Sequence, residues 1–435
     1  MAGGGGGELE VDVAIIGAGA QGLYLARGLA DEYRVCVLSD PTVAPATAAG
    51  SGLISAGYDG DDAARIQPAR RAAGYWKLWA EANGLLDDTE PPVYVVGPDE
   101  RAGRPHVWDD ATLAHCATAL PPILEGGSVA DGDAYLAELD VVVHPGRLLA
   151  ELRSGLEAVC LGGRVADVGL VGDAAVDRVE VQVGDRLLAV AARAVVVAAG
   201  AGNASLLSTI AKRLVDRERR RAAQEQARES QAVRHTTVVV VRGGTLPRLR
   251  GRFGELTVVS HPDGDDVVWH VTRPDHDRTT LGPVDLRFDP RPSPRHVAEV
   301  VGALLAAAPS LVGEIDRLAW ATYGTRDAIH PAVVTEGTGR AARPLPSRLE
   351  TLGLEGLYAL WPSYLGQSMV LGDVVAERIA DALGPSTAAG IDVTRTDLPL
   401  TRRDDGRARW ERDDVGWSAW DEFAVAHHLD APPDG

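Results

Sequence analysis

A glycine motif near the N-terminus constrains the fold more than any other feature of the sequence. Residues 11–16 read Val-Asp-Val-Ala-Ile-Ile, a short β-branched run typical of a buried strand, and the turn Gly17-Ala-Gly-Ala-Gln-Gly22 follows directly. Apolar residues then recur at helical spacing up to Leu29, and a second strand is expected over 33–38. A strand, a G-x-G-x-x-G turn, a helix and a strand within about 30 residues indicate the βαβ unit that binds dinucleotides.

Each glycine of this motif has a physical task. Gly17 makes the tight turn out of the strand, Gly19 lets a pyrophosphate approach the backbone, and Gly22 lets the helix pack close to the sheet. The pyrophosphate then lies at the helix N-terminus, where free N–H groups and the helix dipole favour negative charge. Gln21, at that end of the helix, joins the candidate contacts. A glycine-rich turn without a ligand is the alternative interpretation.

The tip of the second strand departs from the usual dinucleotide pattern. An acidic residue normally stands there and holds the ribose hydroxyls, whereas this chain has Ser39, with Asp40 one residue later. Either Asp40 takes the role, or Ser39 holds the ribose more weakly, or Asp40 is only a loop residue before Pro41.

Charge and composition exclude several classes of protein. The net charge of −19 leaves no basic surplus for nucleic acid or for an anionic membrane surface. No apolar run reaches the roughly 18 residues of a membrane-spanning helix, and residues 1–9 do not resemble a signal peptide. Cys36, Cys116 and Cys160 are widely spaced, without a metal-binding pattern. We therefore expect a cytoplasmic protein without a metal, and the excess of Arg over Lys is typical of a high-GC bacterial genome.

Four further segments follow the glycine motif. They are a Ser/Gly-rich stretch at 48–58, a strand at 164–168, an apolar strand with an Ala-Gly turn at 194–203, and a strand, turn and helix start at 357–370. In sequence and order they resemble the D-amino acid oxidase and glycine oxidase (DAO) family of FAD-dependent oxidoreductases. The resemblance implies FAD contacts at Ser51, Gly52, Leu53, Ile54, Val165, Ala199, Gly200, Gly366, Gln367 and Ser368.

The same resemblance implies an α/β fold with a Rossmann-like FAD-binding domain and an interleaved antiparallel-sheet substrate domain. The expected parts are a disordered lead at 1–9, an FAD-binding domain at 10–64, 146–231 and 331–390, a substrate domain at 65–145 and 232–330, and a C-terminal tail at 391–435. It also implies non-covalent FAD and oxidation of a C–N bond of a small amine or amino acid, with hydride transfer to flavin N5 and reoxidation by O2. A homodimer is left open.

Two departures from the family pattern leave the substrate open. The last FAD segment reads Trp361-Pro-Ser-Tyr-Leu-Gly366 where the family usually has a Gly-His-Gly-like turn. The Arg that holds a substrate carboxylate in the family is matched most nearly by Arg326, within an altered surrounding sequence. The catalytic-site candidates are Arg326, Tyr323 and Trp361, with a salt bridge or core packing as the structural alternatives.

The remaining segments predict further elements. Strands are expected over 235–242, 256–260 and 267–272, the last two joined by a turn at 262–265, and a helix over 297–308. The charged stretch 211–230 predicts a solvated helix, with a lid or a docking surface as the alternative. Other aromatic and histidine residues are assigned as follows: Tyr364 to the flavin face or to core packing, Trp410, Trp417 and Trp420 to packing of the tail, and His270 and His330 to structural roles.

Two other functions stay open at this point. A flavin monooxygenase of related fold normally has a Gly-Asp pair near the last FAD helix, but Gly372-Asp373 lies inside the helix predicted from about residue 370. A flavin-fold binding protein without redox activity is the other alternative, and only the departures at Ser39 and Trp361 support it.

Overall fold

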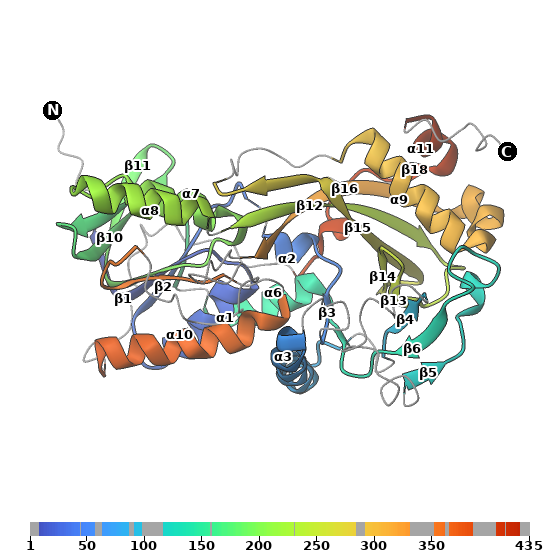
Figure 1. Cartoon of the computed structure of the whole chain (residues 1–435), viewed down its shortest axis with the longest axis horizontal. Coiled ribbons are helices and arrows are strands. Elements are labelled where there is room, and N and C mark those ends of the chain that lie inside the picture. Colours follow the sequence, from blue (N-terminus) through green and yellow to red (C-terminus); the bar gives the residue numbers. More distant parts are fainter. Residues whose placement is uncertain are drawn as a thin grey trace.

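Two β-sheets form the framework of the molecule, with helices on their outer faces and a short helical segment between them (Figure 1). The computed structural model describes residues 8–43, 45–56, 63–86, 91–97, 116–156, 159–229, 231–283, 292–330, 352–361, 365–385, 406–413 and 415–426, with the backbone alone at 8, 63–68, 232, 276–281, 325–330 and 367. Parallel and antiparallel pairing both occur, so the predicted α/β fold class is confirmed.

The first sheet has a parallel centre and an antiparallel edge. In spatial order its strands are β8 (Cys160–Gly162), β2 (Val35–Ser39), β1 (Glu8–Ile16), β11 (Arg186–Val197), β10 (Ala175–Val183) and β9 (Arg164–Val171), and β17 (Leu357–Ala359) pairs with the end of β11. Strands β8, β2, β1, β11 and β17 are parallel. β1 begins before the predicted Val11, because residues 8–10 continue its pairing with β11.

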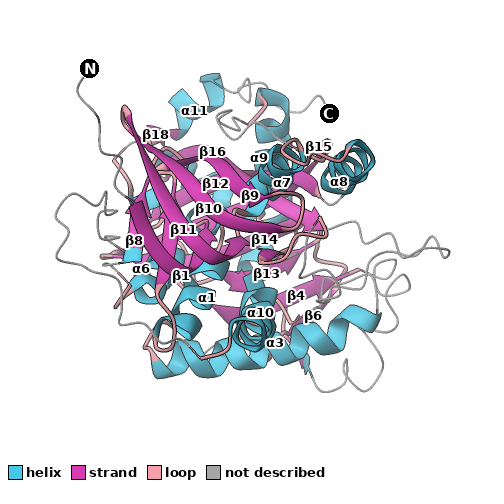
Figure 2. Ribbon diagram, turned by 90° about the vertical axis from the view of Figure 1, so that its left-hand side faces the viewer, coloured by secondary structure: helices cyan, strands magenta, loops and turns pink. Residues whose placement is uncertain are grey.

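The two outermost strands of this sheet are consecutive in the chain. β8 and β9 are separated by Gly163 alone, yet they stand at opposite ends of the strand order. The sheet therefore curls, and Figure 2 shows β9 and β10 turned away from the plane of β1 and β8. A Cβ at Gly163 would lie 2.5 Å from Cγ1 of Val181, so this crossing requires a residue without a side chain.

Helices cover both faces of the first sheet. One face packs against α1 (Ala20–Ala30), α6 (Pro145–Arg153) and α10 (Ser368–Leu383), and the other against α7 (Asn203–Ala211) and α8 (Arg217–Glu229). Strand residues alternate between these two cores: Val13 and Ile15 face α1, whereas Ala14 and Ile16 face α7. Both faces are buried, which explains why β1 reads as a continuous apolar run.

The charged helix predicted over 211–230 is shorter than expected. The chain leaves α7 at Ala211 and starts α8 at Arg217, because the Asp173 carboxylate accepts the backbone N–H groups of Val215 and Asp216 at 2.6 and 2.7 Å and turns the chain. Within α8 only Ala223 and Ala227 are buried, so the charged residues lie on its solvated side as predicted.

The second sheet is almost wholly antiparallel. Its strands in order are β18 (Ser418–Ala419), β16 (Ala319–His330), β12 (Ala232–Gly243), β15 (Asp266–Leu281), β14 (Leu256–Asp263), β13 (Arg250–Phe253), β4 (Val93–Val96), β6 (Asp133–Leu136) and β5 (Ala117–Thr118). Its outer face packs against α9 (Pro294–Ala307) and the 3₁₀ helix η4 (Pro309–Arg317). Within the described part of the chain, no single helix is long and apolar enough to span a membrane; only the bent pair of α9 and η4, taken together, meets that criterion.

Several further elements lie between the cores of the two sheets. They are α2 (Ala46–Ala49), the two-stranded sheet of β3 (Leu53–Ile54) and β7 (Val141–Val142), the long α3 (Ala63–Ala82), and the 3₁₀ helix η6 (Arg409–Glu411) from the C-terminal region. Other short elements lie elsewhere in the fold, namely η1 (Pro122–Leu124), η3 (Gly200–Gly202), η5 (Leu365–Gln367) and α11 (Trp420–Ala426).

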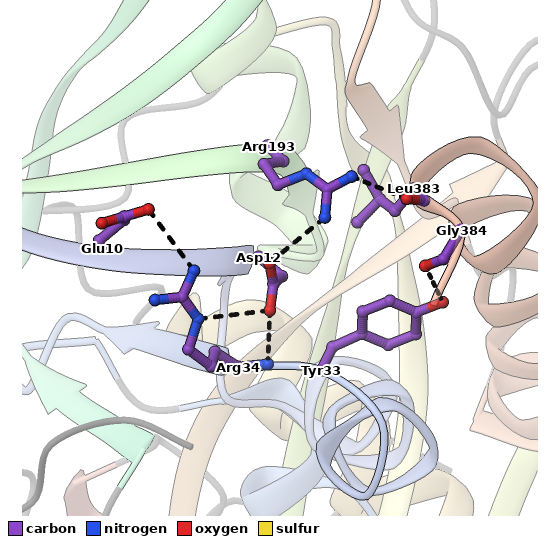
Figure 3. Close-up of polar contacts among 7 residues, drawn as sticks. All are labelled: Glu10, Asp12, Tyr33, Arg34, Arg193, Leu383 and Gly384. Carbon is purple, nitrogen blue, oxygen red and sulfur yellow. Dashed lines mark hydrogen bonds and ion pairs between the residues drawn. The ribbon is translucent and has the colours of Figure 1, made fainter. Parts of the chain in front are cut away.

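A polar network ties the start of the parallel region to the end of α10 (Figure 3). Asp12, on β1, is 2% exposed; it accepts the backbone N–H of Arg34 at 3.0 Å and lies within 3.5 Å of the guanidinium groups of Arg34 and Arg193. Arg193 also donates to the carbonyl of Leu383 at 2.7 Å, and the hydroxyl of Tyr33 donates to the Gly384 carbonyl at 3.0 Å. The last carbonyls of α10 are thus satisfied by side chains.

Candidate dinucleotide-binding site

The carboxyl ends of the parallel strands meet at one edge of the first sheet. β1, β2, β11 and β17 end there, and α1 and η3–α7 follow directly from β1 and β11. Because the C-terminal end of α10 is bound near the start of β2, the N-terminal end of α10 faces the same edge. Three helices therefore direct their positive dipole ends toward this edge, which favours an anionic ligand.

The glycine turn is shaped by close backbone contacts, with one open position. Gly17 has φ of +120°, and a Cβ there would lie 2.3 Å from the carbonyl oxygen of Ala198. A Cβ at Gly22 would lie 2.0 Å from the carbonyl oxygen of Gly17. A Cβ at Gly19, by contrast, would come no closer than 4.0 Å to the side chains of Pro45 and Thr47, its nearest neighbours among the described residues. The backbone at Gly19 is therefore less crowded than at Gly17 and Gly22.

The N–H groups at the start of α1 carry no side-chain cap, because the N-cap residue is Gly19. The neighbouring α6 differs, since the Nδ1 atom of its N-cap His144 accepts the N–H of Arg147 at 3.2 Å. Gln21 is buried, and its Nε2 amide has no hydrogen-bond partner among the described residues. A pyrophosphate or another acceptor-rich group fits this set of donors.

At the tip of β2, Ser39 is the last strand residue and is half-buried. One carboxylate oxygen of Asp40 accepts the backbone N–H and the hydroxyl of Thr42, at 2.9 and 2.7 Å. Asp40 therefore stabilises the turn that leaves the strand, which was one of the interpretations left open.

The Ser/Gly-rich segment lies between the two sheets and is held from both sides. Nε2 of His270 lies 3.1 Å from the Ala49 carbonyl oxygen, and Nε2 of His261 lies 2.9 Å from that of Ser51. A few residues later, the buried carboxylate of Asp140 accepts the backbone N–H of Ala56 at 2.6 Å. The backbone between them is thus fixed, and Leu53 and Ile54 pair with β7.

Gly52 is the tightest point of this segment. It has φ of +77°, and a Cβ there would lie 1.9 Å from the carbonyl oxygen of Val143. Only glycine fits both this conformation and this contact. The half-buried Ser51 precedes it, and its hydroxyl accepts the N–H of Leu53 at 3.4 Å.

Both histidines donate hydrogen bonds to this segment. A carbonyl oxygen only accepts hydrogen bonds, so Nε2 of each ring carries the proton. Burial, helped by the nearby His261, lowers the pKa of His270 to about 3. His270 is therefore an uncharged donor at neutral pH, consistent with the structural role expected for it.

The other predicted FAD residues lie around the same edge. Ala199 and Gly200 follow β11, and the Gly200 carbonyl accepts from Gln231 at 2.8 Å. Gly366 precedes α10, and its carbonyl accepts the Nε1–H of Trp76 at 3.1 Å. Of the other predicted contacts, Ser368 is buried as the first residue of α10, and Val165 lies on β9. Gln367 precedes Ser368, and only its backbone is described.

The catalytic-site candidates lie on two parts of the chain: Tyr323 and Arg326 are on β16, and Trp361 follows β17. Tyr323 is buried on the inner face of the second sheet, in contact with the cluster of His270 and Trp410, and its hydroxyl has no partner among the described residues. Trp361 follows β17 and packs instead against the core beneath α7 and α8, on the same side as Val165. For Arg326 the backbone pairs with His235, and its side chain, like that of His330, lies outside the described residues, as does Tyr364.

Sequence reasoning missed the residues that hold the segment in place. His144, His261 and Asp140 are far apart in the chain and belong to no motif, so their spacing carries no signal. Trp410 was expected to pack the C-terminal tail, but its contact with these histidines was not. Asp373 belongs to the Gly372-Asp373 pair, the candidate feature of a monooxygenase. Its carboxylate accepts a hydrogen bond from the hydroxyl of Tyr24 at 3.0 Å, which links α10 to α1.

The chain is similar to known flavoproteins in sequence and in fold. The family model of the FAD-dependent oxidoreductases, DAO, matches residues 12–358. No curated protein matches the chain.

Among solved structures, a similar fold is found in an FAD-dependent oxidoreductase from Pseudomonas aeruginosa, with 21% identity, a TM-score of 0.62, and coverage of 93% of this chain and 98% of that one. Glycine oxidase from Geobacillus kaustophilus is 18% identical with a TM-score of 0.60, over 91% and 99% of the two chains. Iminodiacetate oxidase from Chelativorans sp. BNC1 is 22% identical with a TM-score of 0.59, over 87% and 97%. At these identities the likeness is one of fold.

Proposed function

Because the chain belongs to the DAO family of FAD-dependent oxidoreductases, we propose that it oxidises a C–N bond of a small amine or amino acid, with O2 as the final electron acceptor. The similarity to glycine oxidase and iminodiacetate oxidase supports this class of substrate. The family match establishes FAD as the cofactor, and we propose that the FAD is held without a covalent bond.

The observation that carries the proposal is the edge where α1, α7 and α10 begin, facing the fixed Ala49–Ala56 segment. Three features fit the pyrophosphate: the open position at Gly19, the uncapped start of α1, and the Gln21 amide, which has no partner among the described residues. The backbone of Ser51–Ile54 and the start of α10 at Gly366–Ser368 would then meet the flavin half, and Val165 the adenine. Helix dipoles at this edge would stabilise negative charge on the reduced cofactor.

We also propose that the two sheets bind different molecules, FAD and the substrate. The seven-stranded sheet and its helices would form the FAD-binding domain, and the inner face of the nine-stranded sheet would cover the substrate. Tyr323 lies on that inner face, and its hydroxyl has no partner within the described part of the chain, which supports a role for it in contacting substrate or flavin. Arg326, on the same strand, remains the proposed anchor for a carboxylate.

The chemistry needs little from the protein beyond placement. FAD, when bound, supplies the acceptor for a hydride from the carbon that bears the nitrogen. Loss of that hydride and of one proton from the nitrogen converts the amine to an imine, and water hydrolyses the imine to a carbonyl compound and an amine or ammonia. O2 takes up the two electrons and two protons as hydrogen peroxide. The residues of the chain orient the substrate, exclude water and stabilise charge.

Visible absorption of the FAD-loaded protein tests the proposal. We expect one or more members of a panel of small amino acids and secondary amines to bleach the flavin bands without air, and peroxide to form in air without NAD(P)H. Peroxide production that requires NAD(P)H would instead indicate a monooxygenase. A purified protein that takes up no FAD would contradict both. Acid precipitation should release all of the flavin if it is not covalently bound.

A further inference from the structure

We propose that the segment Gly406–Glu411 is a wedge between the two sheets, and that Trp410 within it is a positioning residue for the Ala49–Ile54 segment that faces FAD. The inference rests on the proposed FAD contacts of that segment. It assigns a task to a C-terminal region that the family match, which ends at residue 358, does not include.

Trp410 is the centre of the wedge. It is 2% exposed, and its ring contacts three histidines that come from different parts of the chain. The ring is stacked on His261 with centroids 4.9 Å apart, and lies 5.1 Å from His270 and 5.5 Å from His144. His261 and His270 belong to β14 and β15 of the second sheet, whereas His144 caps α6 on the first. One indole thus packs against both halves of the molecule.

Two of these histidines hold the backbone of the proposed FAD segment. Nε2 of His261 donates to the Ser51 carbonyl, and Nε2 of His270 donates to the Ala49 carbonyl. Trp410 lies against the faces or edges of both rings, so it fixes the direction of both N–H groups. The loss of its volume would free the rings to tilt, and the carbonyls of the segment would lose their donors.

The backbone of the wedge packs closely against α6. A Cβ at Gly146, in the first turn of α6, would lie 2.3 Å from the Gly406 carbonyl oxygen and 2.5 Å from the Ala408 nitrogen. The Glu411 carboxylate accepts the N–H of Ala408 at 2.5 Å and lies 3.3 Å from Nε2 of His144. Since Nδ1 of His144 accepts a backbone N–H, its Nε2 carries the proton and donates to Glu411.

The chain that follows the wedge packs on both faces of the second sheet at its edge. Trp410 and Val415 belong to the core on the inner face, whereas Trp420 and Phe423 belong to the core on the outer face. Between them β18 pairs with β16 and becomes the edge strand of the sheet. Trp420 lies 5.1 Å from the ring of Trp320, on the side away from the FAD segment. The two tryptophans thus anchor one segment on opposite faces.

This arrangement supplies a matched pair of variants. Trp410→Ala and Trp420→Ala remove the same side chain from the same segment, but only the first faces the histidines. In the full-length protein we expect Trp410→Ala to weaken FAD binding by about tenfold or more, as the loss of one or two buried hydrogen bonds would. Trp420→Ala should stay within about threefold of the wild type. Titration of the apoprotein with FAD measures both, and thermal unfolding shows that each variant is folded.

A second pair covers the case in which Trp410→Ala does not fold. His261→Gln keeps an N–H donor near the Ser51 carbonyl, whereas His261→Leu removes it. We expect the Leu variant to weaken FAD binding by about tenfold and the Gln variant to restore most of it. Hydrogen exchange of peptides spanning 49–56 should accelerate in Trp410→Ala and His261→Leu but not in Trp420→Ala.

The outcomes separate the two proposals. If the wild type takes up no FAD, the proposed function fails and the inference with it. If the wild type binds FAD and folded Trp410→Ala binds it equally well, or if Trp420→Ala is just as impaired, only the wedge is overturned. Equal affinities of His261→Leu and His261→Gln would also overturn it.

Discussion

At the residue scale, the glycine turn shows how one motif serves two different ends. Gly17 and Gly22 are needed for the fold, since added Cβ atoms there would strike backbone atoms at 2.3 and 2.0 Å. Gly19 has ordinary helix N-cap angles, φ of −77° and ψ of 177°, and open space beside it. The motif thus separates into two structural glycines and one, Gly19, for which we propose contact with the ligand.

This distinction predicts that one alanine substitution lowers the stability of the protein and that another lowers its affinity for FAD. Gly22→Ala forces helix α1 away from the turn and should destabilise the apoprotein by about 1–3 kcal/mol. Gly19→Ala should change its stability by less than about 1 kcal/mol, because a weaker N-cap is offset by lower entropy of the unfolded chain. The same Gly19 variant should bind FAD at least about tenfold more weakly, since a methyl group then occupies the pyrophosphate approach. Urea unfolding and FAD titration test both; unchanged FAD affinity in Gly19→Ala would contradict the assigned site.

His270 makes the protein sensitive to acid. Its pKa is lowered to about 3 in the folded protein, whereas the unfolded chain takes up a proton below about pH 6.5. Between these values the unfolded state binds more protons, so stability is lost as the pH falls through this window, by about 2 kcal/mol at pH 5. The groups around His270 are His261, Tyr323, Trp410 and the Ala49 carbonyl.

Urea unfolding at several pH values measures this loss. In His270→Gln, which keeps a donor but does not titrate, stability should change less between pH 7 and pH 5 than in the wild type. The same slope in both proteins would show that other groups are responsible.

At the element scale, α10 is the part whose placement depends on both of its ends. Its first residues face the candidate site, and its last carbonyls are bound by Arg193 and Tyr33 beside the buried Asp12 (Figure 3). A helix of 16 residues spans about 24 Å, so contacts at the far end help to set where the near end lies.

Arg34 pairs with one buried carboxylate, that of Asp12, and with one exposed carboxylate, that of Glu10, so the two can be compared. Asp12→Asn should destabilise the protein by about 2 kcal/mol, below the range for fully buried ion pairs because Arg193 is half exposed. Glu10→Gln should cost less than about 0.5 kcal/mol, because the Glu10 side chain is 77% exposed and lies 3.6 Å from Arg34. Chemical unfolding of the two variants measures the difference, and equal losses would refute the role of burial.

Elements with a strong local signal were predicted from the sequence, and contacts between distant segments were not. The strands at β1, β12, β14 and β15 and the helices α1 and α9 follow from apolar periodicity and turn residues. The break between α7 and α8 depends on Asp173, about 40 residues away, and the place of η6 depends on three histidines on other elements. Neither leaves a pattern within its own segment, so no local rule finds it.

At the scale of the whole molecule, the Ala49–Ala56 segment receives contacts from both sheets. A ligand bound there stabilises the folded form by mass action, with about 2.7 kcal/mol expected at a free concentration of 100 Kd. We therefore expect removal of FAD to lower the unfolding temperature, and added FAD to raise it with the logarithm of its concentration. Scanning fluorimetry over a range of FAD concentrations checks this; an unfolding temperature independent of FAD would contradict binding at this segment.

The strand order also determines when during synthesis the site becomes complete. β1 pairs with β11, about 180 residues later, and β11 in turn pairs with β17. Trp410 is later still. A ribosome adds roughly 5–20 residues per second, so the glycine turn made first waits many seconds for its neighbours. During that interval the edges of β1 and β2 are exposed to other chains, and nascent-chain chaperones would have their main task there.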